Sequence, residues 1–189
     1  MLLQEGAHFD ALDVLTDDLF KKANQISGGS AWIISNGEPS WIELSMGAVL
    51  PKLKKTLYDE KWEDRRVISA RQQFQALLPD DKAIWKERSF NQLIKHWVPA
   101  RFQGNKQRDR RPTQTRDAYS IISIGDSEND VESLMNVEAK LTDTFKKTVK
   151  LVNNPSLSQV VEQVKAVKEG LEFILEKKSD LHLVASWGA

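Results

Sequence analysis

The chain has 189 residues, of which 40% are apolar and 29% are charged, a length that suits one domain. Its 27 basic and 27 acidic side chains balance, which argues against a general nucleic-acid binder and against a charged tail protein. The absence of cysteine excludes disulfides, thiolate nucleophiles and cysteine-ligated metals, and the three histidines are far apart in sequence. The chemistry that remains is mainly that of carboxylates, hydroxyls and lysines.

The sequence contains no recognisable targeting segment. Residues 1–10 lack a basic region followed by a long apolar run, so no signal peptide is expected. No stretch approaches the roughly 18 apolar residues of a membrane span. We therefore expect a cytoplasmic protein with no membrane partner.

The first half of the chain alternates helical and extended patterns. Residues 1–28 are predicted to form an N-terminal helical segment, because their leucines recur at helical spacing. The apolar run 31–34 is typical of a buried strand. A helix is expected from Pro39, and Pro51 either kinks it or starts a new one. The predicted apolar face of that helix consists of Trp41, Leu44 and Ala48.

The second half repeats this alternation. Strands are predicted at 67–70, 119–124 and, more weakly, 148–152. Helices are predicted from Asp80 or Asp81 to Trp97, from about Ser127, and at the C-terminal end over 155–178. The basic segment 98–118 lacks apolar periodicity and is expected to be a loop.

This order of elements predicts the fold class. Strands that alternate with helices favour a single α/β domain over 1–189, with a three-layer α/β/α, Rossmann-like parallel sheet. Ligands of such sheets bind beyond the carboxyl ends of the strands. Four tryptophans in apolar patterns are expected in the core. They are Trp32, Trp41, Trp85 and Trp97.

The strongest local motif is Gly-Asp-Ser-Glu-Asn-Asp over 125–130, directly after the predicted strand. Asp126 and Asp130 are four residues apart, so they project together once a helix has begun. Two neighbouring carboxylates repel each other, and Mg²⁺ with its preference for oxygen ligands would reconcile them. The alternative is structural: Asp126 caps the helix, while Glu128 and Asp130 lie favourably in its first turn.

Two further signals precede this motif. Ser35 and Asn36 follow the first predicted strand, where a hydroxyl beside free backbone amides can hold a phosphate oxygen. Lys86, next to Trp85, can supply a point charge for the same phosphate. Both signals have structural alternatives, since Ser35 can cap the next helix and Lys86 can be a solvated surface residue.

The basic segment 101–116 raises the hypothesis of nucleic-acid association. Residues 101–119 contain six basic and two acidic side chains, flanked by Phe102 and Tyr119. Interleaved stacking aromatics are lacking, which favours a charged, solvated loop. We therefore expect no nucleic-acid partner.

Taken together and in this order, the three signals resemble the haloacid dehalogenase-like phosphohydrolase superfamily over about residues 10–165. The resemblance implies that Ser35 is the second motif, Lys86 the third and Asp126 with Asp130 the fourth. Lys95 is the rival for the third motif. It further implies a phosphate site at Ser35, Asn36 and Lys86, and Mg²⁺ at Asp126 and Asp130. The partner would be a phosphorylated small molecule or protein.

The family's first motif, Asp-x-Asp with the nucleophile, does not occur anywhere in the chain. Asp10, Asp13, Asp17 and Asp18 have other spacings and lie in the helical N-terminal segment. Family phosphatases form an aspartyl-phosphate on this motif, so no catalytic residue is assigned here. We expect an inactive or N-terminally truncated phosphatase. The alternatives are a non-catalytic binding or regulatory module, and a phosphatase that is active only if an upstream segment supplies the nucleophile.

The missing motif also has a structural implication. In the family, the first strand lies in the middle of the sheet, between the strands of motifs two and four. Its loss either leaves a gap in the sheet or makes those two strands pair directly, because unpaired backbone groups inside a sheet are costly. The sequence leaves both arrangements open.

Overall fold

The computed structural model describes residues 2–27, 30–58, 66–79, 81–103, 119–137 and 144–186. The N-terminal part contains α1 (Leu2–Ile26), β1 (Ile33–Ser35), α2 (Pro39–Val49), α3 (Pro51–Leu57), β2 (Val67–Ser69) and α4 (Ala70–Phe74). The C-terminal part contains α5 (Lys82–Gln103), β3 (Tyr119–Gly125), α6 (Glu128–Met135), β4 (Thr144–Lys150), α7 (Leu157–Glu176) and β5 (Leu181–Val184).

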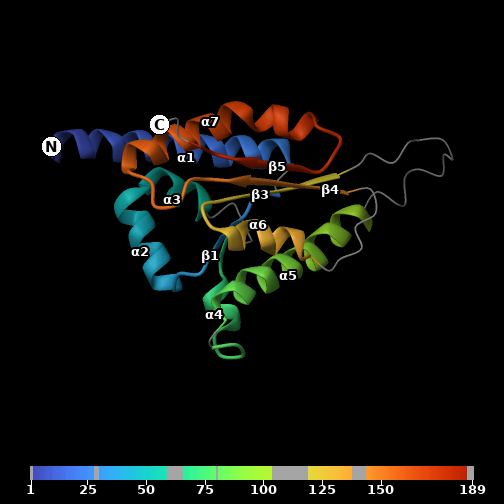
Figure 1. Ribbon diagram of the computed structural model, residues 1–189. Coiled ribbons are helices and arrows are strands. Elements are labelled where there is room, and N and C mark those ends of the chain that lie inside the picture. Colours follow the sequence, from blue (N-terminus) through green and yellow to red (C-terminus); the bar gives the residue numbers. More distant parts are fainter. Residues whose placement is uncertain are drawn as a thin grey trace.

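The described strands form two small parallel sheets. One has the order β1-β2, with Ser35 opposite Ser69, and the other has the order β3-β4-β5. In Figure 1, α7 and α1 lie on one side of the larger sheet, while α6 and α5 lie on the other. The prediction of an α/β protein with parallel strands and helices on both faces is confirmed, but the described strands are divided between two sheets instead of forming one.

This division bears on the expectation that the sheet lacks a central strand. The strands to which the resemblance assigns the second and fourth motifs are β1 and β3, and in the described part of the chain they belong to different sheets. Of the two arrangements left open by the sequence, the structure has the one without direct pairing. Helix α5 spans the division, since it packs against β1 and α4 on one side and against α6 on the other.

Several predicted elements match the structure closely. The N-terminal segment forms α1, Pro39 and Pro51 each stand in the first turn of a helix, and the C-terminal helix forms α7. Asp81 caps the start of α5 by accepting a hydrogen bond from the amide of Ile84.

Other expectations were wrong. Residues 98–103 continue α5 instead of starting a loop, and the rest of the predicted loop, 104–118, lies outside the described residues. The fourth strand starts at Thr144, not at 148, because Lys146 and Lys147 interrupt its apolar pattern yet find partners in the fold. The short elements α4 and β5 were not anticipated.

The tryptophans divide between core and surface. Trp85 is 2% exposed and packs with Ala70 and Phe74, as expected. Trp41 is 64% exposed, so the expectation that it joins the core is wrong. Helix α2 instead buries Ile42 and Met46, which lie on a different face of the helix from the predicted one. Trp32 is half-buried, and the side chain of Trp97 lies outside the described set.

The aspartates of α1 hold the N-terminal half together. Asp13 is buried, and its carboxylate accepts hydrogen bonds from the backbone amides of Lys52 and Leu53 at 3.0 and 3.2 Å. These amides belong to the first turn of α3 and have no partner within that helix. Asp13 therefore caps α3 from a different helix, where its charge also suits the helix dipole.

We expect Asp13→Ala to lower the free energy of unfolding by about 1–3 kcal/mol, because two backbone amides in the first turn of α3 lose their acceptor. Urea denaturation of the purified chain measures the change. Asp10→Ala, at an exposed position on the same helix, is the control and should change stability by less than about 0.5 kcal/mol. Equal losses in both variants would contradict the capping role.

Lys147 is a fully buried lysine in the middle of the larger sheet. Its side chain is 0% exposed, and Nζ donates to the carbonyl oxygens of Ile174 and Leu175 at 2.6 and 3.0 Å. These carbonyls lie in the last turn of α7, where a cation is favourable. Burial removes the ammonium from water and lowers the pKa of Lys147 from its ordinary value of 10.5.

The lowered pKa predicts a pH dependence of stability. Between the folded pKa and 10.5, the folded chain binds fewer protons at Lys147 than the unfolded chain does. The free energy of unfolding therefore gains a contribution that rises with pH in this window. Chemical denaturation of the natural chain and of Lys147→Met at neutral and alkaline pH measures the effect. The natural chain should gain stability relative to the variant as pH rises, and a constant difference would contradict it.

None of the helices in the described part of the chain combines the length and apolar composition needed to cross a lipid bilayer. The cytoplasmic location stays a prediction.

Candidate functional site

The candidate site is built around the turn from β3 into α6. The strand ends at Gly125, and Ser127 is the N-cap residue of the helix. Ser127 donates from its backbone amide and its hydroxyl to Oδ2 of Asp130, at 3.2 and 3.0 Å. This reciprocal capping box fixes the Asp130 carboxylate beside the strand end. The structural alternative for Asp130 is thus present, with Ser127 in place of Asp126 as the cap.

The second oxygen of Asp130 is bound by Lys86. The Nζ atom of Lys86, on α5, donates to Oδ1 of Asp130 over 2.5 Å. The two side chains are only 15% and 11% exposed. A charge pair with this little solvent is weakly screened, and either member alone would be an uncompensated charge. Lys86 is therefore not a solvated surface lysine, whereas Lys95 further along α5 is exposed.

Gly125 is needed for the close approach of this carboxylate. A Cβ atom built on Gly125 would collide with the side chain of Asp130. Any larger residue would push the carboxylate away from both Ser127 and Lys86. The glycine of the sequence motif thus leaves room for the Asp130 side chain and also permits the turn.

Asp126 differs from Asp130 in its surroundings. Its side chain is exposed, and its carbonyl oxygen accepts a hydrogen bond of 2.8 Å from Nζ of Lys150. Lys150 is buried at the end of β4 and also donates to Leu151 and to the side chain of Asn153. It therefore ties the loops after β3 and β4 together. A small pocket of about 220 Å³ opens beside Gly125 and Asp126.

The smaller sheet contributes Ser35 and Asn36 at the end of β1. The hydroxyl oxygen of Ser35 accepts a hydrogen bond of 3.0 Å from the amide of Gly37, which shapes the turn. Asn36 donates through Nδ2 to the carbonyl of Lys82, in the first turn of α5. Its buried Oδ1 has no hydrogen-bond partner among the described residues. Such an oxygen costs about 1–3 kcal/mol unless a ligand or cation satisfies it.

Helix α5 links these two groups. Its first turn holds Asn36, and Lys86 one turn later holds Asp130. Asn36 and Asp130 are therefore attached to one helix, although they follow strands of separate sheets. The structure joins Lys86 directly to Asp130, and it joins neither Ser35 nor Asp126 to that pair by a hydrogen bond.

No cluster of three or more metal-ligating side chains occurs within the described ranges. Both oxygens of Asp130 already accept hydrogen bonds, from Lys86 and from Ser127, so a cation there would share the carboxylate with these donors. The exposed carboxylate of Asp126 is the more accessible oxygen ligand. Magnesium binding by Asp126 and Asp130 stays a prediction.

Sequence reasoning missed Ser127 and Lys150. Ser127 followed by an acidic residue three positions later is a capping-box pattern, and it was available in the sequence. Lys150 gave no comparable signal, because a lysine in a strand is usually solvated.

No family model, curated protein or solved structure matches this chain. The assignment of a function therefore rests on the geometry and on the order of the motifs.

The Lys86–Asp130 pair makes a measurable prediction. We expect Lys86→Ala and Asp130→Asn each to lower the free energy of unfolding by about 1–3 kcal/mol, because each leaves a poorly solvated partner. A double-mutant cycle by urea denaturation should give a coupling energy above about 0.5 kcal/mol. Lys95→Ala combined with Asp130→Asn is the control and should show simple additivity. A coupling near zero for Lys86 would contradict the pair.

Proposed function

We propose that this chain is a phosphate-recognising α/β domain of the haloacid dehalogenase-like type that lacks its catalytic nucleophile. The observation that carries the proposal is the contact between Lys86 and Asp130, the third and fourth motifs of the resemblance. The residues are 44 positions apart, and the contact forms at the carboxyl end of β3. Ligands of parallel α/β sheets bind at that edge.

Lys86 is suited to hold a phosphate. An ammonium has three N–H donors, so Lys86 can bind a phosphate oxygen and keep its contact with Asp130. The hydroxyl of Ser35 accepts from Gly37, which leaves its own proton to donate to a second phosphate oxygen. Mg²⁺ would use the exposed carboxylate of Asp126, with water and phosphate oxygens filling the remaining positions.

Turnover is not part of the main proposal. The sequence contains no Asp-x-Asp, and Asp13 and Asp17 are buried in contacts between α1 and α3. Ser35 is no substitute nucleophile, because among the described residues its hydroxyl is bound by the amide of Gly37 and not by a base that would take its proton. The domain would therefore bind a phosphorylated small molecule or protein as a regulatory or recognition module.

One observation favours a second candidate, an active phosphatase. Strands β1 and β3 lie in different sheets, as they would if a strand that belongs between them were supplied separately. The resemblance places the nucleophilic Asp-x-Asp on that strand. If an upstream segment provides it, Ser35, Lys86 and Asp126 would surround the aspartyl-phosphate.

Thermal unfolding tests the main proposal. Inorganic phosphate at 10 mM or more with MgCl₂, on the order of millimolar, should raise Tm by a few degrees, because a ligand bound only by the folded state stabilises it. Lys86→Ala and Asp126→Ala should each remove the shift, whereas Lys95→Ala should keep it. An unchanged Tm, or an equal shift in the Lys86 variant, would rule out this phosphate site.

An aryl phosphate assay separates the two candidates. With Mg²⁺, the chain alone should release no more aryl alcohol than buffer does. Turnover by the chain alone that is abolished in Asp126→Asn would contradict the inactive assignment. Fusion of an extended segment with Asp-x-Asp ahead of residue 1 should restore turnover only if the second candidate is correct.

A further inference from the structure

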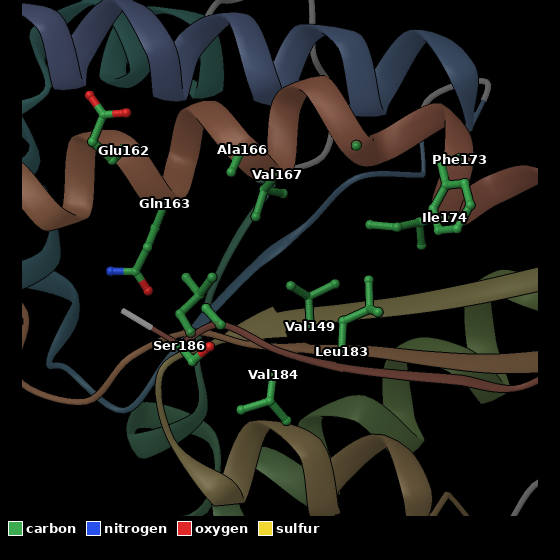
Figure 2. A pocket seen from close by; sticks show the side chains of 13 residues that line it. Val149, Glu162, Gln163, Ala166, Val167, Phe173, Ile174, Leu183, Val184 and Ser186 are labelled. Carbon is green, nitrogen blue, oxygen red and sulfur yellow. The ribbon is translucent and has the colours of Figure 1, made fainter. Parts of the chain in front are cut away.

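The far edge of the larger sheet carries an open apolar groove. Strand β5 is the last strand of this sheet in the described part of the chain, and α7 lies alongside it. The groove between them has a volume of about 350 Å³. Figure 2 shows Val167 and Ile174 of α7 above Val149 and Leu183 of the strands. The groove extends along the sheet edge away from the pocket beside Asp126, with which it shares Leu151 and Gln163 as lining residues.

Within the part of the chain that the structure describes, α1 is the helix that covers α7, and it covers one flank. Helix α1 packs there, with Lys168 bound to Asp18 at 2.6 Å and Glu172 bound to Lys22 at 2.9 Å. The opposite flank borders the groove. At helical spacing it presents Glu162, Ala166, Gly170 and Phe173. Just beyond the helix, the ammonium of Lys177 lies 4.9 Å from the centroid of the Phe173 ring. Phe173 is 53% exposed, a large apolar surface to leave in water.

The sequence of this flank is self-complementary. A two-fold axis between positions 169 and 170 places position 162 opposite 177 and position 166 opposite 173. The axis would thus bring Glu162 to Lys177 of the second copy, and Ala166 to the Phe173 ring of the second copy. Gly170 lies at the axis, where the absence of a side chain lets two helices approach closely. Opposite charges and matched sizes in this order are what an isologous interface requires.

Strand β5 satisfies the same symmetry independently. The amide of Ala185 donates to the carbonyl of Lys150, so residues 181, 183 and 185 direct their backbone groups toward β4. By alternation, His182 and Val184 direct theirs toward the open edge. Antiparallel pairing about Leu183 would then join His182 to Val184 of the second copy. It would also cover Val184, which is 61% exposed.

The two axes coincide. Lys147 is the register partner of Leu181 and donates to the carbonyls of Ile174 and Leu175, which places that turn of α7 beside Leu181. Leu183 lies about 7 Å further along the strand. Helix α7 runs antiparallel to β5, so the same distance corresponds to about four to five residues back from Ile174 and Leu175, which leads to Gly170. One two-fold axis can therefore pass through both Leu183 and Gly170.

We propose that a second copy of this chain docks on this edge. The two β5 strands pair antiparallel, which continues the sheet across the dimer, and the two α7 helices pack side by side over it. Strand β5 carries no lysine or proline, the residues with which monomers commonly protect a sheet edge. The proposal does not depend on phosphate binding.

Light scattering during size-exclusion chromatography tests the dimer. The full chain should elute with twice its mass of 21.5 kDa at tens of micromolar concentration. Glu162→Lys and Lys177→Glu should each raise the dissociation constant about tenfold, because two contacts per dimer become repulsive. The double exchange Glu162→Lys with Lys177→Glu should restore the dimer. Lys165→Glu, which is exposed and does not line the groove, is the matched control and should change nothing.

A disulfide provides a second, geometric test. The natural chain has no cysteine, so a single substitution gives an unambiguous cross-link. A side chain at Gly170 meets no atom within 4 Å in the monomer, so Gly170→Cys should fold normally. Under mild oxidation it should form a covalent dimer, whereas Lys165→Cys should not.

Either of two results would overturn the proposal. One is a monomeric mass at every concentration up to about 100 µM, where a specific interface should still associate. The other is a dimer that the single charge reversals leave unchanged and that Gly170→Cys does not cross-link, which would place a different surface or a different partner on this edge.

Discussion

Two sheets that are not paired with each other must be joined by helices, and this constraint organises the structure. On one face, α5 contacts β1 and α4 near its start and α6 further along, and its Lys86 is bound to Asp130. On the other face, α1 packs against both α3 and α7. Two successive residues of α1 contact different cores. Phe20 belongs to the core cluster beside the smaller sheet, and Leu19 packs against the cluster beside the larger sheet.

The polar groups that serve this assembly are the groups that a phosphate site would use. Asp130 caps α6 through Ser127, neutralises Lys86 and lies against Gly125. A ligand that competes for Lys86 therefore acts on a contact between the two halves of the fold and not on an isolated surface residue. Binding and stability are coupled at this point, so variants of Asp130 must be judged by both measurements.

Much of the fold was predictable because apolar periodicity and turn residues report local structure. Pro39, Pro51 and the end of β3 at Gly125 are examples. The start of β4 was not predictable, since Lys147 is buried only because the end of α7 supplies two carbonyl acceptors. Trp41 was misplaced because a helix with apolar residues on several sides does not reveal which side faces the core. For the site, sequence order indicated Lys86 and Asp130, whereas their contact depends on how α5 crosses α6.

The split sheet also has a mechanical consequence. Each half has its own apolar clusters, centred on Leu57 and Trp85 in one half and on Leu134 and Val149 in the other. Between them run side-chain contacts of α1 and α5, which yield more readily than a ladder of backbone hydrogen bonds. We therefore expect the two halves to rotate against each other more easily than either half deforms, with α1 and α5 as the connection. Amide protons on the sides of β1 and β3 that lack a strand partner in the described part of the chain would then exchange with solvent by local opening, well before the interiors of the two halves do.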